Sequence, residues 1–181
     1  MIRRAERADA AAIATIYNQA MGEGIFATCD VAPVTVESRV EWLAKHESPY
    51  PAFVFEGEGG AVLGWSALSP FSVRPSYPSI AEIAVYVEEQ HRSRTVGAAL
   101  FFELISSAKE LGFRSLVSLT FEKNSPSLRG LEAAGFRRVG VLAEVAWLRG
   151  RWESVVWLQK ELEGDPAAAD PRLRRWLSRP T

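Results

Sequence analysis

The chain has 181 residues, of which 48% are apolar, 24% charged and 10% aromatic, and 21 basic side chains face 22 acidic ones. The length suits one domain, and the composition is that of an ordinary globular protein rather than a disordered one. A net charge of -1 gives no electrostatic reason to expect a nucleic acid or an anionic membrane as partner. A single cysteine, Cys29, excludes an internal disulfide and a cysteine-based zinc site, so we expect no metal.

The N-terminal residues, MIRRAERADA, mix charged and apolar side chains and lack the apolar block of a signal peptide. No apolar run along the chain reaches the ~18 residues that a membrane span needs. We therefore expect a cytoplasmic protein that does not associate with membranes.

The first quarter of the chain predicts a short strand and two helices. The strand lies at 2–5, and Asp9 is the expected N-cap of a helix at 10–20, because its carboxylate can accept from the free amides of the first turn. A glycine-containing loop follows, and the second helix is expected to start at Thr35. Its buried side is predicted to consist of Val36, Val40, Trp42 and Leu43.

The middle of the chain predicts three strands. Residues 52–55 and 61–68 flank a glycine-rich turn, which is the pattern of a hairpin. The loop at 69–79 contains three prolines, which exclude regular structure there. Residues 80–87, IAEIAVYV, alternate between two sets of side chains, and this period of two predicts a strand.

The last part of the chain predicts two helices, three strands and a tail. A long amphipathic helix at 97–111 ends before Gly112, and a strand at 115–121 follows. Ser125 is the expected N-cap of a short helix, with Pro126 in its first turn and Gly135 as its stop. The remaining strands, at 138–146 and 152–162, form a hairpin, and 164–181 form a tail rich in Pro, Ala and Arg.

The predicted element order is β-α-α-β-β-β-α-β-α-β-β. The hairpins are antiparallel, whereas a strand–helix–strand unit is parallel, so the sheet must be mixed. The sequence thus predicts a single α/β domain over 1–163, with a central mixed sheet flanked by helices.

The segment 82–113 carries the chemical signal. A strand runs through a short basic loop with Arg92 and Arg94 to Gly97, where the predicted helix starts. Free amides and the positive end of the dipole make a helix N-terminus a phosphate site, so we predict a cofactor with a diphosphate. The P-loop and dinucleotide patterns are absent. The alternative is an ordinary strand–loop–helix unit with two surface arginines.

Several stretches resemble known acetyltransferases. Residues 82–97 with the helix that follows, and NSPSLRGLEAAGF at 124–136, resemble the acetyl-CoA-binding core of the GNAT superfamily of N-acetyltransferases. The stretches IYNQ at 16–19, GWSALSPFSVRPSY at 64–77 and RGRWESVVWLQKEL at 149–162 resemble its phosphinothricin acetyltransferase subgroup, which acetylates the α-amino group of amino-acid-like compounds. The resemblance extends to about Leu162 and implies a single GNAT domain.

The resemblance implies acetyl-CoA as cosubstrate, with loop amides around its diphosphate, the strand end along its pantetheine arm, and Asn124 near the thioester. The implied cofactor-binding residues are Val85, Tyr86, Val87, Arg92, Ser93, Arg94, Thr95, Val96, Gly97, Ala98 and Asn124. Thr95 departs from the family's glycine. If that position required a positive φ, the β-branched residue would cost about 1–2 kcal/mol.

The resemblance implies Glu82 as the catalytic base, because an ammonium acceptor must lose a proton before it attacks the thioester. A partly buried carboxylate with a raised pKa can take that proton directly or through water. The alternative role is a strand-surface carboxylate paired with an arginine. Many relatives place an acid for the departing thiolate where Leu131 stands, so positioning and backbone N–H groups would supply most of the rate.

For the acceptor, the resemblance implies a small amino acid or an analogue such as phosphinothricin or methionine sulfoximine. Arg74 and Tyr77 match the subgroup's loop, Phe71 is a candidate for the pocket wall, and Glu23 is a weaker candidate for contacting the ammonium. The alternatives for Arg74 and Tyr77 are an arginine in solvent and a tyrosine packed on proline.

Two other functions stay open from the sequence. One is a GNAT enzyme with a different acceptor, such as an antibiotic amine, a polyamine or a protein N-terminus. The other is a non-catalytic acyl-CoA-binding module. The aromatic final hairpin, together with the resemblance, also implies a homodimer.

Overall fold

A computed structural model describes residues 1–22, 26–74, 76–92 and 94–163, and of Arg94 it describes the backbone alone. The strands are β1 (Ile2–Arg4), β2 (Ala52–Glu56), β3 (Val62–Pro70), β4 (Ile80–Val87), β5 (Ser115–Phe121), β6 (Arg137–Leu148) and β7 (Arg151–Glu161). The helices are α1 (Ala10–Gln19), α2 (Val36–Ala44), α3 (Arg94–Glu110) and α4 (Ser125–Ala133). This confirms the predicted element order.

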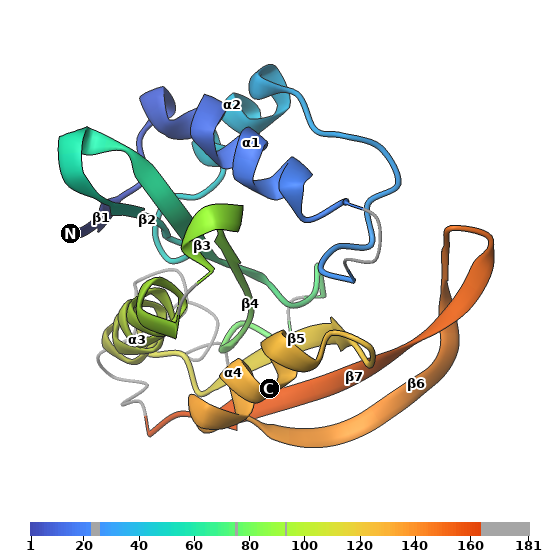
Figure 1. Ribbon diagram of the computed structural model, residues 1–181. Coiled ribbons are helices and arrows are strands. Elements are labelled where there is room, and N and C mark those ends of the chain that lie inside the picture. The colour runs from blue at the N-terminus through green and yellow to red at the C-terminus, as the bar shows by residue number, and fades with distance from the viewer. Residues whose placement is uncertain (23–25, 75, 93, 164–181) are drawn as a thin grey trace.

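The strands form one seven-stranded mixed sheet in the order β1-β2-β3-β4-β5-β7-β6. Helices α1 and α2 lie on one face and α3 and α4 on the other (Figure 1). Only β4 and β5 pair in parallel, as the strand–helix–strand unit through α3 requires. The predicted α/β architecture is therefore confirmed. None of the helices in the described part of the chain is long and apolar enough to cross a membrane.

The central strand β4 is paired unequally on its two sides. It pairs with β3 along its length, from Ala81 opposite Pro70 to Val87 opposite Gly64. With β5 it pairs only over its first three residues, and the last pair joins Glu82 to Val117. Beyond this pair the two strands separate, so the sheet opens between their carboxyl-terminal halves.

Alternation along β4 assigns its side chains to two cores. Ala81 and Ile83 pack in the core below α3 and α4. Ala84 and Tyr86 pack against the core below α1 and α2. Because successive side chains point to opposite faces, Glu82 lies on the face of α1 and α2.

The two helices that border the opening begin at other residues than predicted. Helix α3 starts at Arg94, three positions before Gly97. Its first turn, at 94–97, holds one apolar side chain, Val96, which is too little to show a helical period in the sequence. Helix α4 is capped by Asn124, whose side chain accepts from the Ser127 amide at 3.2 Å, so the prediction of Ser125 as N-cap was wrong. The predicted stop is confirmed, with Gly135 at a φ of 86°.

Two predictions for the N-terminal helices were also wrong in detail. Asp9 is the N-cap of α1, as predicted, but its carboxylate makes no capping bond to the helix amides and accepts instead from both Nη atoms of Arg3, at 2.8 and 2.9 Å. A bidentate charged pair is the stronger interaction. On α2, Val36 is exposed, whereas Arg39 is buried, with its guanidinium 4.3 Å from the centre of the Tyr17 ring. An arginine can pack its stem and its planar group like an apolar residue.

Candidate active site

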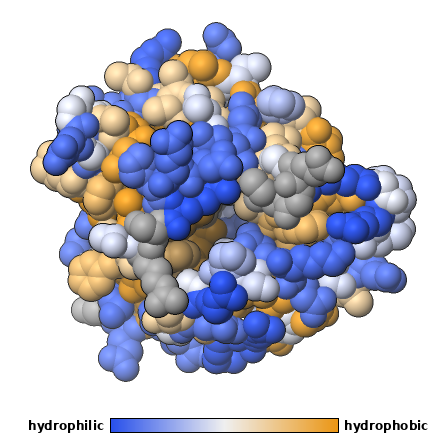
Figure 2. Space-filling view, in the orientation of Figure 1, coloured by the Kyte–Doolittle hydropathy of each residue, from blue (hydrophilic) through white to orange (hydrophobic). Residues whose placement is uncertain are grey.

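A cavity of about 1340 Å³ occupies the opening between β4 and β5. Its walls come from both strands, from α3 and α4, and from the loop after α1. Pockets for small ligands measure about 300–1,000 Å³, so this one admits a longer molecule. Figure 2, in the orientation of Figure 1, shows a hollow near the middle of the molecule, with hydrophobic residues inside it and hydrophilic ones around it.

The backbone of β4 presents hydrogen-bonding groups to this cavity. The Glu88 amide donates to the Leu63 carbonyl at 2.9 Å, so the even-numbered residues of β4 direct their backbone amides and carbonyls to β3. By the alternation of an antiparallel ladder, Val85 and Val87 direct their amides and carbonyls to the opposite side. Since β5 has separated there, these groups face the cavity. An extended ligand can therefore be added as a strand along this edge.

Glu82 lies on the cavity wall at the point where the strands separate. The side chain is half-buried, and burial raises the pKa of its carboxyl above the usual value. The described residues include no ion pair or hydrogen-bond partner for this carboxylate, in contrast to the paired carboxylates Asp9 and Glu153. Such a group can accept a proton near neutral pH.

The segment that leads into α3 lies at another part of the same cavity. Arg92 lines it and donates from Nε to the Val87 carbonyl at 3.4 Å, and Gly97 and Ala98 line it from the helix. Val96 is buried and points instead toward Gly64 on β3. Ser93 lies outside the described residues.

Thr95 is the second residue of α3 and has helical backbone. Among the described non-glycine residues, a positive φ occurs only at Glu144 and Arg149. The steric cost that a positive φ at Thr95 would have imposed therefore does not arise.

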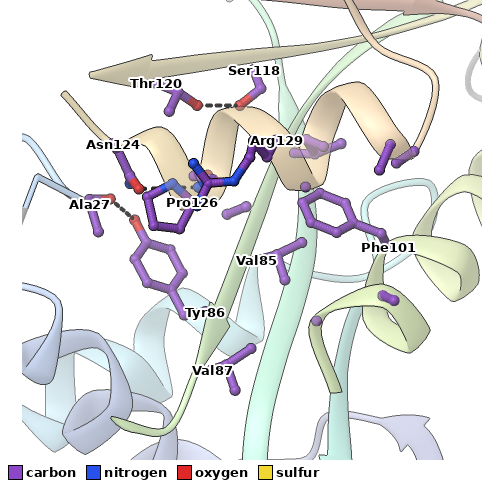
Figure 3. A pocket seen from close by; sticks show the side chains of 18 of the residues that line it. Ala27, Val85, Tyr86, Val87, Phe101, Ser118, Thr120, Asn124, Pro126 and Arg129 are labelled. Carbon is purple, nitrogen blue, oxygen red and sulfur yellow. Dashed lines mark hydrogen bonds between the residues drawn. The ribbon is translucent and has the colours of Figure 1, made fainter. Parts of the chain in front are cut away.

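Helix α4 faces the edge of β4 across the cavity. In Figure 3, Asn124 and Arg129 lie opposite Val85 and Tyr86. The side-chain oxygen of Asn124 is engaged by the helix cap, which leaves its amide nitrogen for a ligand. Leu131 is fully buried in the core, so this helix offers no acid at that position.

Two hydroxyl groups of β5 that the sequence reasoning missed also line the cavity. Ser118 and Thr120 are buried and lie 3.2 Å apart, oxygen to oxygen (Figure 3). The signal was available in the sequence, since SLVSLTF places Ser118 and Thr120 two positions apart, on one face of a mostly apolar strand.

Three of the four residues predicted to bind the acceptor, Phe71, Arg74 and Tyr77, lie on the loop between β3 and β4, outside the cavity lining. Phe71 and Tyr77 are brought together, with ring centres 5.6 Å apart, and Phe71 lies 5.8 Å from Trp157 on β7. Trp157 is paired with Leu119, which does line the cavity, so this aromatic cluster borders it. Arg74 is exposed on the same loop. Glu23 lies outside the described residues.

No group of three or more His, Cys, Asp or Glu side chains suited to a metal ion occurs in the part of the chain that the structure describes. The described residues thus arrange a strand edge, the start of a helix and the Glu82 carboxylate around one long cavity.

A model of the acetyltransferase (GNAT) family matches residues 13–136. The chain belongs to this family and is an N-acetyltransferase, which confirms the resemblance seen in the sequence.

The relatives point to one subgroup. YwnH of Bacillus subtilis, whose name assigns it provisionally to the phosphinothricin acetyltransferases, is 36% identical over 89% of this chain and 98% of its own length. The L-methionine sulfoximine/L-methionine sulfone acetyltransferase of Salmonella typhimurium is 30% identical over 93% of this chain and 98% of its own. A solved phosphinothricin acetyltransferase of Sinorhizobium meliloti, in complex with acetyl-CoA, is 28% identical with a TM-score of 0.84, over 94% of this chain and 92% of that one.

Proposed function

We propose that this enzyme transfers the acetyl group of acetyl-CoA directly to the α-amino group of an amino acid or an analogue of the phosphinothricin or methionine sulfoximine kind. The observation that carries the proposal is the end of β4–β5 pairing at Glu82. Here a free strand edge and a carboxylate with no ion-pair partner among the described residues share one cavity. The names of the relatives support the acceptor class.

The residues around the cavity fit acetyl-CoA. The amides and carbonyls of Val85 and Val87 would pair with the amide groups of its pantetheine arm. The free amides in the first turn of α3, around Gly97, and the guanidinium of Arg92 would hold its diphosphate. Asn124 would contact it from α4. When bound, acetyl-CoA supplies an acetyl group activated as a thioester.

Glu82 would serve as the base. Its burial raises its pKa, so the carboxylate can take a proton from the acceptor's ammonium near neutral pH. The freed amine then forms a bond to the acetyl carbon while the carbon–sulfur bond breaks. With Leu131 in place of an acid, the thiolate takes, through water, the second proton that the nitrogen loses as the amide forms, and a thiol with a pKa of about 8.5 permits this.

The acceptor would enter from the face of α1 and α2, to which Glu82 belongs. Arg74 offers a planar fork that can bind a carboxylate or phosphinate with two hydrogen bonds. The cluster of Phe71, Tyr77 and Trp157 beside it would contact the acceptor's side chain. These roles require the β3–β4 loop to reach the cavity across Leu119.

We also propose a homodimer that buries the outer face of the last hairpin. Large apolar side chains are exposed there, with Trp147 at 56% and Trp152 at 55%. The two indole rings stack edge to face with centres 5.1 Å apart. The other exposed apolar residues of β6 are Val139, Val141, Leu142 and Val145. Large exposed apolar side chains gathered on one hairpin support an interface there.

A thiol-release assay tests the proposed function. The protein is mixed with acetyl-CoA and a panel of amines that contains phosphinothricin, methionine sulfoximine, a polyamine and a peptide with a free N-terminus. We expect turnover with the first two. Turnover with another amine alone would change the acceptor class, and a thermal shift with acetyl-CoA but no thiol release would indicate a non-catalytic binding module.

A further inference from the structure

The last turn of α1 contacts two segments of the chain that lie next to the cavity. The helix itself is anchored in the core, where Ile13 and Ile16 are buried. Two residues near its end, Tyr17 and Gln19, point to different segments, one to the loop after α1 and one to the turn after β4. Both belong to the IYNQ stretch, to which no function has been assigned so far.

Tyr17 fixes the loop after α1. Its hydroxyl donates to the Asp30 carboxylate at 2.5 Å and lies 2.5 Å from the Thr28 hydroxyl. Because a phenol has one proton, the Thr28 hydroxyl must donate to Tyr17, and it accepts in turn from the Asp30 amide at 3.1 Å. Tyr86 adds a second tie, from its hydroxyl to the Ala27 carbonyl at 3.0 Å (Figure 3).

This loop borders the catalytic carboxylate. Phe26 and Ala27 line the same cavity as Glu82. Partial burial raises the pKa of the Cys29 thiol, and the carboxylates of Asp30 and Glu82 add to this effect. Cys29 therefore lies within electrostatic reach of Glu82. The position of residues 26–30 therefore sets the space beside Glu82 on the face where the acceptor would bind.

Gln19 fixes the turn after β4. Its side-chain oxygen accepts from the Glu89 amide at 2.9 Å, and its amide nitrogen donates to the Glu88 carboxylate at 3.4 Å. The Glu88 carboxylate also accepts from the Gln90 amide at 2.9 Å and from Nδ1 of His91 at 2.6 Å. This network organises the turn that leads to Arg92 and to the start of α3.

We propose that Tyr17 and Gln19 are positioning residues. From one rigid helix, Tyr17 holds the loop at 26–30 on the acceptor side, and Gln19 holds the turn at 88–91 on the cofactor side. The inference rests on the proposed function and adds a division of labour to it. Tyr17 acts on the space for the amine, and Gln19 acts on the cradle for the diphosphate. Each residue acts through a loop and contacts neither substrate.

The test measures KM for each substrate separately. Tyr17→Phe keeps the buried ring and removes only the hydroxyl, so it should raise the acceptor KM about fivefold to tenfold and leave the acetyl-CoA KM unchanged. Gln19→Ala should raise the acetyl-CoA KM by a similar factor and leave the acceptor KM unchanged. Thr15→Ala is the matched control, since among the described residues the Thr15 hydroxyl bonds only to the Ala11 carbonyl within the helix.

A charge exchange sharpens the Gln19 half. Gln19→Glu keeps an acceptor for the Glu89 amide but sets a carboxylate against that of Glu88, so it should weaken acetyl-CoA binding. Adding Glu88→Gln removes this repulsion and should restore part of the affinity. A merely structural role for Gln19 would not produce this rescue.

The outcomes separate the inference from the proposed function. If the wild type releases no thiol with any amine, the proposed function fails. In that case acetyl-CoA affinity by calorimetry and amide exchange of residues 27–30 still test the two residues. In an active enzyme, the inference is overturned if each variant changes both KM values equally. In an inactive one, it is overturned if Gln19→Ala keeps the acetyl-CoA affinity and Tyr17→Phe keeps the amide exchange of residues 27–30.

Discussion

Glu82 and Val117 form the last pair of residues that joins β4 to β5. The position of this pair determines the candidate site. Before it, the parallel strands complete the sheet, and after it the edge of β4 faces a cavity. Glu82 thus lies at the closed end of the opening, where an extended ligand laid along Val85 and Val87 would end.

Replacing Glu82 tests the proposed base. Glu82→Gln should lower kcat by about 10²–10⁴-fold, the usual contribution of general base catalysis, with little change in acetyl-CoA affinity. Burial raises the pKa of Glu82, so the proton-accepting carboxylate forms only as the pH rises above the usual range of a glutamate. In the wild type kcat/KM should therefore rise with pH through this pKa, and the variant should lose that limb. An unchanged pH profile in Glu82→Gln would remove Glu82 from the mechanism.

Gly97→Ala should have opposite effects on stability and binding. Gly97 lies in α3, and an added Cβ would meet Val87 Cγ2 at 3.7 Å, an ordinary contact. Alanine should stabilise the helix by about 0.5–1 kcal/mol, seen as a higher Tm without ligand. The same methyl group would crowd a diphosphate at the amides of this turn, so the Kd for acetyl-CoA should rise. A higher Tm with unchanged acetyl-CoA binding would place the diphosphate elsewhere.

The final hairpin is predicted to carry the dimer contact. Trp152→Glu puts a charge into the exposed apolar face of β6 and β7 and should convert the dimer to a monomer. Light scattering after gel filtration gives the mass directly. Glu41→Lys on the exposed side of α2 is the control for a change of charge and should remain dimeric. A wild type that is monomeric at micromolar concentration would refute the proposed interface.

Asp9 is predicted to stabilise the fold through Arg3. Hydrogen bonds from Arg3 are the main cause of the lowered pKa of Asp9. A carboxyl whose pKa is lower in the folded state adds stability above its unfolded pKa and loses it as the pH falls through the folded one. Because Arg3 is partly exposed and keeps Glu56 as a partner, Asp9→Asn should cost about 1.5–3 kcal/mol near neutral pH and flatten the acid side of the stability profile. Chemical denaturation across pH measures both, and a parallel, merely displaced profile would contradict this account.

Within the described residues, the sequence predicted the order and type of every strand and α-helix, because most of these elements have a clear apolar period. It failed where the deciding interaction involves polar groups. The first turn of α3, from Arg94, has no apolar pattern. On α2, Val36 was expected to be buried, but Arg39 is buried and Val36 is exposed. The polar network of Tyr17 and Gln19 was equally invisible, since Gln19 meets a partner 70 positions along the chain.

The site was predicted only in part, for a similar reason. Strands β4 and β5 were both expected, but the residue at which their pairing ends depends on how α3 and α4 pack below them. The resemblance supplied Glu82 and the cofactor segment. It gave no indication of the hydroxyls of Ser118 and Thr120, which the structure places on the cavity wall.

A crystal structure with acetyl-CoA bound tests the central claim most directly. We predict that the pantetheine amides lie within hydrogen-bond distance of the Val85 and Val87 backbone, with the diphosphate at the start of α3 and the thioester next to Glu82. A coenzyme bound outside the opening between β4 and β5, or with its thioester far from Glu82, would contradict the account.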